Sequence, residues 1–165
     1  IIASGKRRGL SADVQAGFAA QTTRRAEALV TMLKALDAEA TEALTGKERS
    51  VVVVGHDAWR RFGDRYQLTT IAINGLLAAE PTPAALKAAT EAIKKHQLTT
   101  VFVEPQLSSA MSKRLAEVTG VKLATLDPLG SGDYFAMMRA NIKAVSESLG
   151  ARKVVTPKPA DSPAK

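Results

Sequence analysis

Apolar residues recur at three- and four-residue spacing along the beginning of the chain, as on one face of a helix. Residues 11–44 contain no proline and one glycine, while Ser11 supplies an N-cap and Gly46 a C-cap. The apolar stripe is formed by Leu29, Leu33, Leu36, Ala40 and Leu44. The pattern predicts a long connecting helix over residues 11–46, about 50 Å long at 1.5 Å per residue. Residues 1–10 have no periodicity and predict an irregular lead-in.

Short β-branched runs then alternate with amphipathic segments. Strands are predicted over residues 51–54, 69–73, 99–103 and 121–126. Helices are predicted over residues 56–66, 82–96, 108–120 and 134–149. Thr82, followed by Pro83 in the first helical position, is the predicted N-cap of the second helix, and Ser108 or Ser109 is the predicted N-cap of the third. This alternation predicts right-handed crossovers and an α/β three-layer domain over residues 47–150, with a four-stranded, mainly parallel sheet. The proline-rich residues 151–165 predict a flexible tail.

The chain is basic, but its charge pattern does not indicate a nucleic-acid-binding site. There are 23 Lys and Arg residues against 16 Asp and Glu residues, a net charge of +7. The basic residues are scattered and do not alternate with aromatic residues, so we expect a solvated surface and no nucleic-acid partner. The longest apolar run, residues 51–54, is too short to span a membrane. Cysteine is absent, which excludes disulfides and thiolate metal sites.

Three polar residues follow predicted strands: His56, Glu104 and Asp127. Because the carboxyl ends of parallel strands meet at one edge of a sheet, we expect all three at that edge, where ligands bind. We also expect His56 at a helix start, where the positive end of the helix dipole keeps its ring neutral and able to bind metal. Each residue also has a structural alternative. His56 could be a structural residue at the end of its strand, and Glu104 could serve only to end the strand before it. Asp127 could be a turn residue or the cap of the last helix.

The other candidate residues are interpreted as core or surface residues without a role in binding. His96 stands at a predicted helix C-terminus and is interpreted as a surface residue. Trp59, Phe62 and Tyr66 have helical spacing and are interpreted as core residues. The sequence has no phosphate-binding P-loop and no Gly-x-Ser-x-Gly nucleophile motif, so we do not expect an enzyme.

Three segments carry a family resemblance. They read VVVVGHDAW over residues 51–59, VFVEPQ over residues 101–106 and LDPLG over residues 126–130. In this order and at this spacing they resemble the signatures of the zinc/manganese solute-binding proteins of ABC transporters. Asp133-Tyr134 and the helix through Asn141 resemble the closing segment of that family. Residues 11–44 resemble the long helix that joins its two lobes.

The resemblance implies a protein that captures a divalent metal between two lobes, through four ligands, for an ABC transporter permease. His56 matches the position of the third ligand and Asp127 that of the fourth, and Glu104 would accept the free N–H of a ligating His. A His rather than a Glu at residue 56 favours zinc, with manganese as the alternative. The implied location is periplasmic or extracytoplasmic and membrane-associated.

The sequence departs from the family in one respect. The family's amino-terminal lobe, which carries two further His ligands, has no counterpart here, and the chain contains two histidines in all. We therefore expect an incomplete metal site in this chain alone and a missing N-terminal lobe as a partner. No signal peptide is recognisable. The rival hypothesis is an α/β interaction module, or a repurposed half-protein, that lacks the metal site.

Overall fold

The computed structural model describes residues 11–74 and 82–151, which form two compact units divided between Glu39 and Ala40. The first unit is helical and belongs to α2, which runs from Ala12 to Leu44. Ser11 caps α2, since its Oγ accepts a hydrogen bond from the Val14 backbone N–H at 3.4 Å. The predicted lead-in and residues 152–165 of the predicted tail lie outside the described residues.

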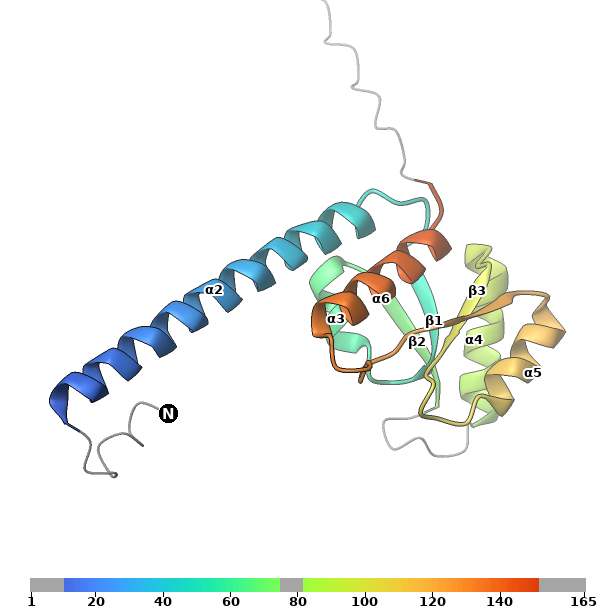
Figure 1. The fold of residues 1–165 in the computed structure, drawn as a ribbon. Helices are drawn as coiled ribbons and strands as arrows, with labels where there is room; N and C mark the ends of the chain where they lie inside the picture. The colour runs from blue at the N-terminus through green and yellow to red at the C-terminus, as the bar shows by residue number, and fades with distance from the viewer. Residues whose placement is uncertain (1–10, 75–81, 152–165) are drawn as a thin grey trace, which may run out of the picture. The chain divides into compact units, whose positions relative to one another are not determined.

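The second unit is built on a four-stranded sheet (Figure 1). Its strands are β1 (Val51–His56), β2 (Thr69–Asn74), β3 (Thr100–Val103) and β4 (Lys122–Thr125). They lie in the order β2-β1-β3-β4, and every pair is parallel. The prediction of an α/β domain with a mainly parallel sheet after a long helix is confirmed.

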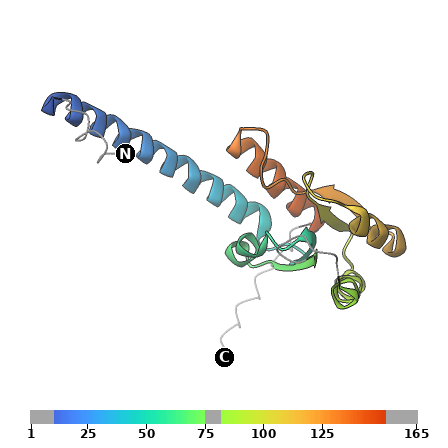
Figure 2. The same cartoon turned by 90° about the horizontal axis from the view of Figure 1, so that it is seen from below.

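Helices cover both faces of this sheet, as the two views in Figures 1 and 2 show. Helices α4 (Pro83–His96) and α5 (Ala110–Thr119) pack on one face, while α3 (Arg60–Tyr66) and α6 (Tyr134–Ser148) lie on the other. Because side chains alternate along a strand, β1 and β3 contribute buried side chains to both faces of the sheet. Val51, Val53 and Val101 join the cluster formed with α4 and α5. Their neighbours in the strands, Val52, Val54 and Phe102, are also buried and point to the opposite face.

The predicted helix caps differ in outcome. The Thr82 hydroxyl accepts a hydrogen bond from the Ala85 backbone N–H at 3.1 Å, with Pro83 in the first turn, as predicted. Ser109 is the N-cap residue of α5, but its side chain makes no capping hydrogen bond, so that part of the prediction is wrong. Its φ of −102° and ψ of 9° differ from the extended backbone in which a side chain caps a helix.

No helix among residues 11–74 and 82–151 combines the length and apolar character needed to cross a membrane.

Candidate metal centre

His56 is the last residue of β1 and pairs with Asn74 of the neighbouring strand. The prediction that His56 begins a helix is wrong. A turn follows the strand, with the Ala58 backbone N–H donating to the His56 carbonyl at 2.9 Å, and α3 begins at Arg60. His56 therefore does not lie at the positive end of a helix dipole.

The His56 ring lies against the carboxylate of Glu104, which follows β3. Nδ1 of His56 is 3.4 Å from Oε1 of Glu104, and the two side chains are 16% and 6% exposed. The same Oε1 accepts a hydrogen bond from Nε1 of Trp59 at 3.0 Å. Trp59 is itself buried. A buried carboxylate thus faces one ring nitrogen of a histidine whose side chain is still partly open to solvent.

The interior beside His56 has little free space. A cavity of about 10 Å³ is enclosed by the carboxyl ends of β1 and β2 and by the start of α5, a volume that holds about one water molecule. Its polar lining includes His56, Asn74, Glu104, Ser108 and Ser112. Any larger ligand or hydrated ion must therefore reach His56 from the solvent side.

Asp127 lies two residues beyond β4 and forms a tight turn. Its Oδ1 accepts three hydrogen bonds: from Nε2 of Gln106 at 2.7 Å and from the backbone N–H groups of Leu129 and Gly130, both at 3.0 Å. The Gly130 N–H, the Gln106 amide and the Leu129 N–H, in this order, lower the pKa of Asp127 from its usual 3.8. The carboxylate therefore stays charged under mildly acidic conditions.

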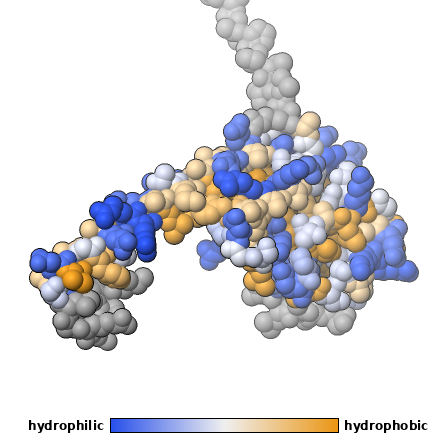
Figure 3. Space-filling view, in the orientation of Figure 1, coloured by the Kyte–Doolittle hydropathy of each residue, from blue (hydrophilic) through white to orange (hydrophobic). Residues whose placement is uncertain are grey.

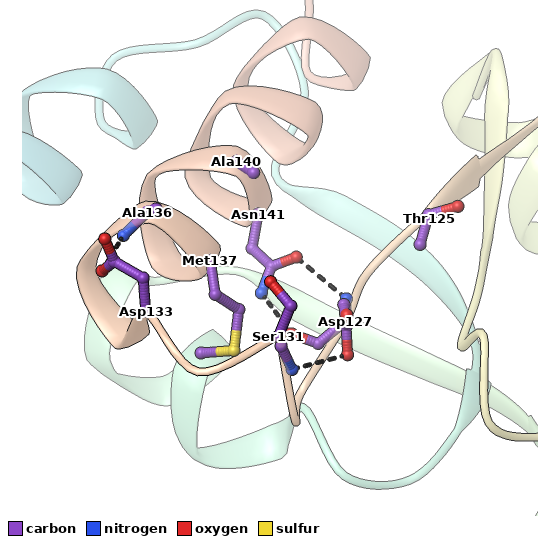
Figure 4. Close-up of a pocket in the computed structure, with 9 residues that line it drawn as sticks. Thr125, Asp127, Ser131, Asp133, Ala136, Met137, Ala140 and Asn141 are labelled. Carbon is purple, nitrogen blue, oxygen red and sulfur yellow. Dashed lines mark hydrogen bonds between the residues drawn. The ribbon is translucent and has the colours of Figure 1, made fainter.

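Asn141 of α6 makes two hydrogen bonds to the backbone of Asp127. Oδ1 of Asn141 accepts from the Asp127 backbone N–H at 2.9 Å, and Nδ2 of Asn141 donates to the Asp127 carbonyl at 2.7 Å (Figure 4). Asn141 is 3% exposed. Asp133 is the N-cap of α6, and its Oδ1 accepts a hydrogen bond from the Ala136 N–H at 3.0 Å. The turn role of Asp127 is thus observed, whereas its role as a helix cap is wrong.

A pocket of about 320 Å³ opens beside this turn, between the end of β4 and α6 (Figure 4). Asp127, Asp133 and Met137 are among the residues that line it.

The structure joins the predicted site residues into two groups. His56 and Glu104 are in contact, and Asp127 contacts Gln106 from the loop that also carries Glu104. In the part of the chain that the structure describes, no group of three or more His, Cys, Asp or Glu residues is placed to hold a metal ion. Each group can supply one ligand of the kind zinc binds, an imidazole nitrogen or a carboxylate oxygen.

The remaining predictions concern residues of the surface and the core. His96 ends α4 and is exposed, as expected. Trp59 and Tyr66 are buried, and Phe62 makes edge-to-face contacts with both rings. Sequence reasoning missed the roles of Gln106 and Asn141. Their signals were weak: an amide two residues after Glu104, and a polar residue beside the apolar stripe of the last helix.

Comparisons with known proteins identify the family. The family model described as "Zinc-uptake complex component A periplasmic" (ZnuA) matches residues 9–148. The chain is 31% identical over 135 residues to the zinc-binding lipoprotein AdcA of Streptococcus pneumoniae serotype 4, covering 76% of this chain and 27% of AdcA. It is 34% identical over 100 residues to the high-affinity zinc uptake system protein ZnuA of Haemophilus influenzae, covering 56% of this chain and 29% of that protein.

Solved structures give the same result. A crystal structure of ZnuA superposes with a TM-score of 0.75 and 26% identity, covering 84% of this chain and 52% of that one. The laminin-binding protein Lbp of Streptococcus pyogenes gives a TM-score of 0.71 and 27% identity, covering 77% and 52%. The chain thus spans about a quarter of the length of AdcA and half of these solved relatives. With its family model matched over residues 9–148, the chain belongs to the ZnuA family of zinc-binding solute-binding proteins of ABC transporters.

Proposed function

We propose that this chain is the C-terminal lobe, with the connecting helix, of an extracytoplasmic protein that captures a divalent metal ion for an ABC transporter. Zinc is the favoured ion and manganese the alternative. The observation that carries the proposal is the His56–Glu104 pair, with Nδ1 of the ring 3.4 Å from the carboxylate. A carboxylate that holds one nitrogen of a ligating histidine orients the ring and raises its basicity.

In this proposal His56 binds the ion through Nε2, since Nδ1 faces Glu104. Asp127 supplies a carboxylate oxygen, and Glu104 orients the ring without touching the metal. The buried Trp59 indole donates to Glu104 and holds that carboxylate in place. An imidazole nitrogen suits zinc better than manganese, which prefers oxygen ligands, and this supports zinc.

The remaining ligands come, in this proposal, from a partner lobe. Zinc is usually bound by four ligands, and His56 and Asp127 account for two. Solved relatives are about twice as long as the matched region, with 52% of their length covered. In the first unit α2 carries exposed apolar side chains (Figure 3), among them Val14, Phe18, Leu29 and Met32. An exposed apolar face of this kind is expected where another part of a protein packs.

The proposed partner is the permease of an ABC transporter, and the proposed location is the periplasm or the outer face of the cytoplasmic membrane. This rests on the family description as periplasmic and on AdcA, which is described as a zinc-binding lipoprotein. No enzymatic step is proposed. The ion is cargo, so the described residues need only bind it and release it.

The alternative is an interaction module that has no working metal site. One observation favours it: the described residues hold no group of three metal-ligating side chains. In that case the α/β unit would serve as a scaffold, and neither His56 nor Asp127 would matter for binding.

A calorimetric zinc titration separates the two hypotheses. The wild-type chain is compared with His56→Ala and Asp127→Ala, and with the matched controls His96→Ala and Asp64→Ala at exposed positions. Loss of a ligand should weaken zinc binding by more than the roughly tenfold that a supporting residue costs. Metal capture predicts this loss in the first two variants and unchanged binding in the controls. Zinc binding of equal strength in all five proteins would support the scaffold instead.

A further inference from the structure

The two carboxylate oxygens of Asp127 have different surroundings. Oδ1 is occupied by three donors, and the shortest of these bonds comes from Gln106 at 2.7 Å. Among the residues that the structure describes, no hydrogen bond reaches Oδ2. A carboxylate oxygen that already accepts three hydrogen bonds has no lone pair left for a metal ion.

The donors to Oδ1 come from two different loops. Leu129 and Gly130 belong to the turn that Asp127 itself begins, while Gln106 belongs to the loop after β3, 21 residues earlier. Gln106 therefore ties the Asp127 turn to the segment that carries Glu104. Since Glu104 also faces His56, one short loop contacts both proposed ligands.

We propose that Gln106 is a positioning residue of the metal site, which holds Oδ1 of Asp127 so that the metal is bound through Oδ2 alone. This inference rests on the proposed function of Asp127 as a ligand. A carboxylate restricted to one oxygen adds a single ligand, which suits the four-coordinate geometry of zinc. Ions that prefer six or more oxygen ligands gain from a carboxylate that binds through both oxygens. Gln106 thereby contributes to selectivity for zinc.

The test uses a zinc titration followed by the ¹³C NMR signal of the Asp127 side-chain carboxyl, which reports weak as well as tight binding. Gln106→Met keeps the length of the side chain but removes the N–H donor. Gln21→Met, on an exposed position of α2, is the matched control. His56→Ala reports whether the signal arises from the proposed site. Backbone amide spectra of all variants establish that the fold is retained.

We expect a saturable shift of the Asp127 signal in the wild-type chain, which His56→Ala weakens. Gln106→Met should weaken zinc binding about tenfold, the loss typical of residues that support a metal ligand, and should change the limiting Asp127 shift because the carboxylate is released. Gln21→Met should match the wild type. A crystal structure of the zinc-bound chain should place zinc on Oδ2.

Two contrary results are distinguishable. If the wild type binds zinc, His56→Ala weakens binding and Gln106→Met leaves both the affinity and the limiting shift unchanged, Gln106 has no positioning role and the proposed function stands. If the Asp127 signal of the wild type does not respond to zinc, Asp127 is not a ligand in this chain. Both the ligand role of Asp127 and the inference about Gln106 are then wrong.

Discussion

Nδ1 of His56 lies 3.4 Å from Oε1 of Glu104, although 48 residues separate the two along the chain. The contact exists because β1 and β3 are neighbours in the sheet, so that residues at their carboxyl ends meet. Glu104 is buried and also accepts from the Trp59 indole. One carboxylate thus links the fold of the α/β unit to the orientation of the proposed metal ligand.

The substitution Glu104→Gln should separate the role of Glu104 in the fold from its role in orienting His56. The amide retains an oxygen that accepts from Trp59, so the free energy of unfolding should change little. The negative charge facing His56 is lost, and zinc affinity should fall about tenfold. Calorimetry and urea unfolding measure the two effects, with Glu117→Gln on an exposed position of α5 as control. Unchanged zinc affinity would mean that Glu104 has no role in zinc binding.

Asn141→Leu should destabilise the α/β unit. The substitution keeps the volume of the buried side chain but leaves the backbone N–H and carbonyl of Asp127 without their partners. We expect a loss of about 1–3 kcal/mol in the free energy of unfolding, measured by urea denaturation. Lys143→Leu, at an exposed position of the same helix, should change stability by less than about 0.5 kcal/mol. Equal effects at both positions would contradict the assigned role of Asn141.

The stability of the metal-free chain should depend on pH through Asp127. The pKa of this carboxyl is lowered in the folded state from the usual 3.8, so the folded chain is protonated there only at lower pH than the unfolded chain. The contribution of its charge is therefore fully present above the unfolded pKa and disappears as pH falls through the lowered value. Urea unfolding of wild type and Asp127→Asn should differ most near neutral pH and converge in strong acid. A difference between the two proteins that does not change with pH would contradict this role of the Asp127 charge.

Two glycines should respond to alanine in opposite ways. At Gly63 in α3 an added Cβ would lie 2.7 Å from the Leu68 carbonyl oxygen and 2.9 Å from Cγ2 of Thr70, so the backbone must shift. At Gly17 in α2 nothing lies within 4 Å. Gly63→Ala should lower stability by about 1–3 kcal/mol. Gly17→Ala should favour the helix by about 0.5–1 kcal/mol.

Thermal unfolding followed by circular dichroism tests the glycine pair. A lower melting temperature for Gly63→Ala and increased helicity or thermal stability for Gly17→Ala are the expected results. A tolerated alanine at Gly63 would mean that the α3–β2 connection has room that the structure does not show.

The sequence by itself determined the order and type of the elements in the α/β unit. Apolar β-branched runs such as residues 51–54 form strands because they can be buried on both faces, and the three- to four-residue spacing in the last helix forms an amphipathic α6. Alternation of strands and helices was enough to predict a parallel sheet. That prediction also brought His56 and Glu104 to the same edge, because parallel strands end together.

Tertiary structure decided where the elements stop and how the site is supported. The first strand extends to His56 because it pairs with Asn74 of β2, a register that local composition does not encode. Because of this pairing, His56 ends a strand and does not start the helix that the sequence had indicated. Likewise, Gln106 and Asn141 reach Asp127 across 21 and 14 residues. Amide side chains suit turns, caps and surfaces equally well, and only the packing of β3, β4 and α6 selects Asp127 as their partner.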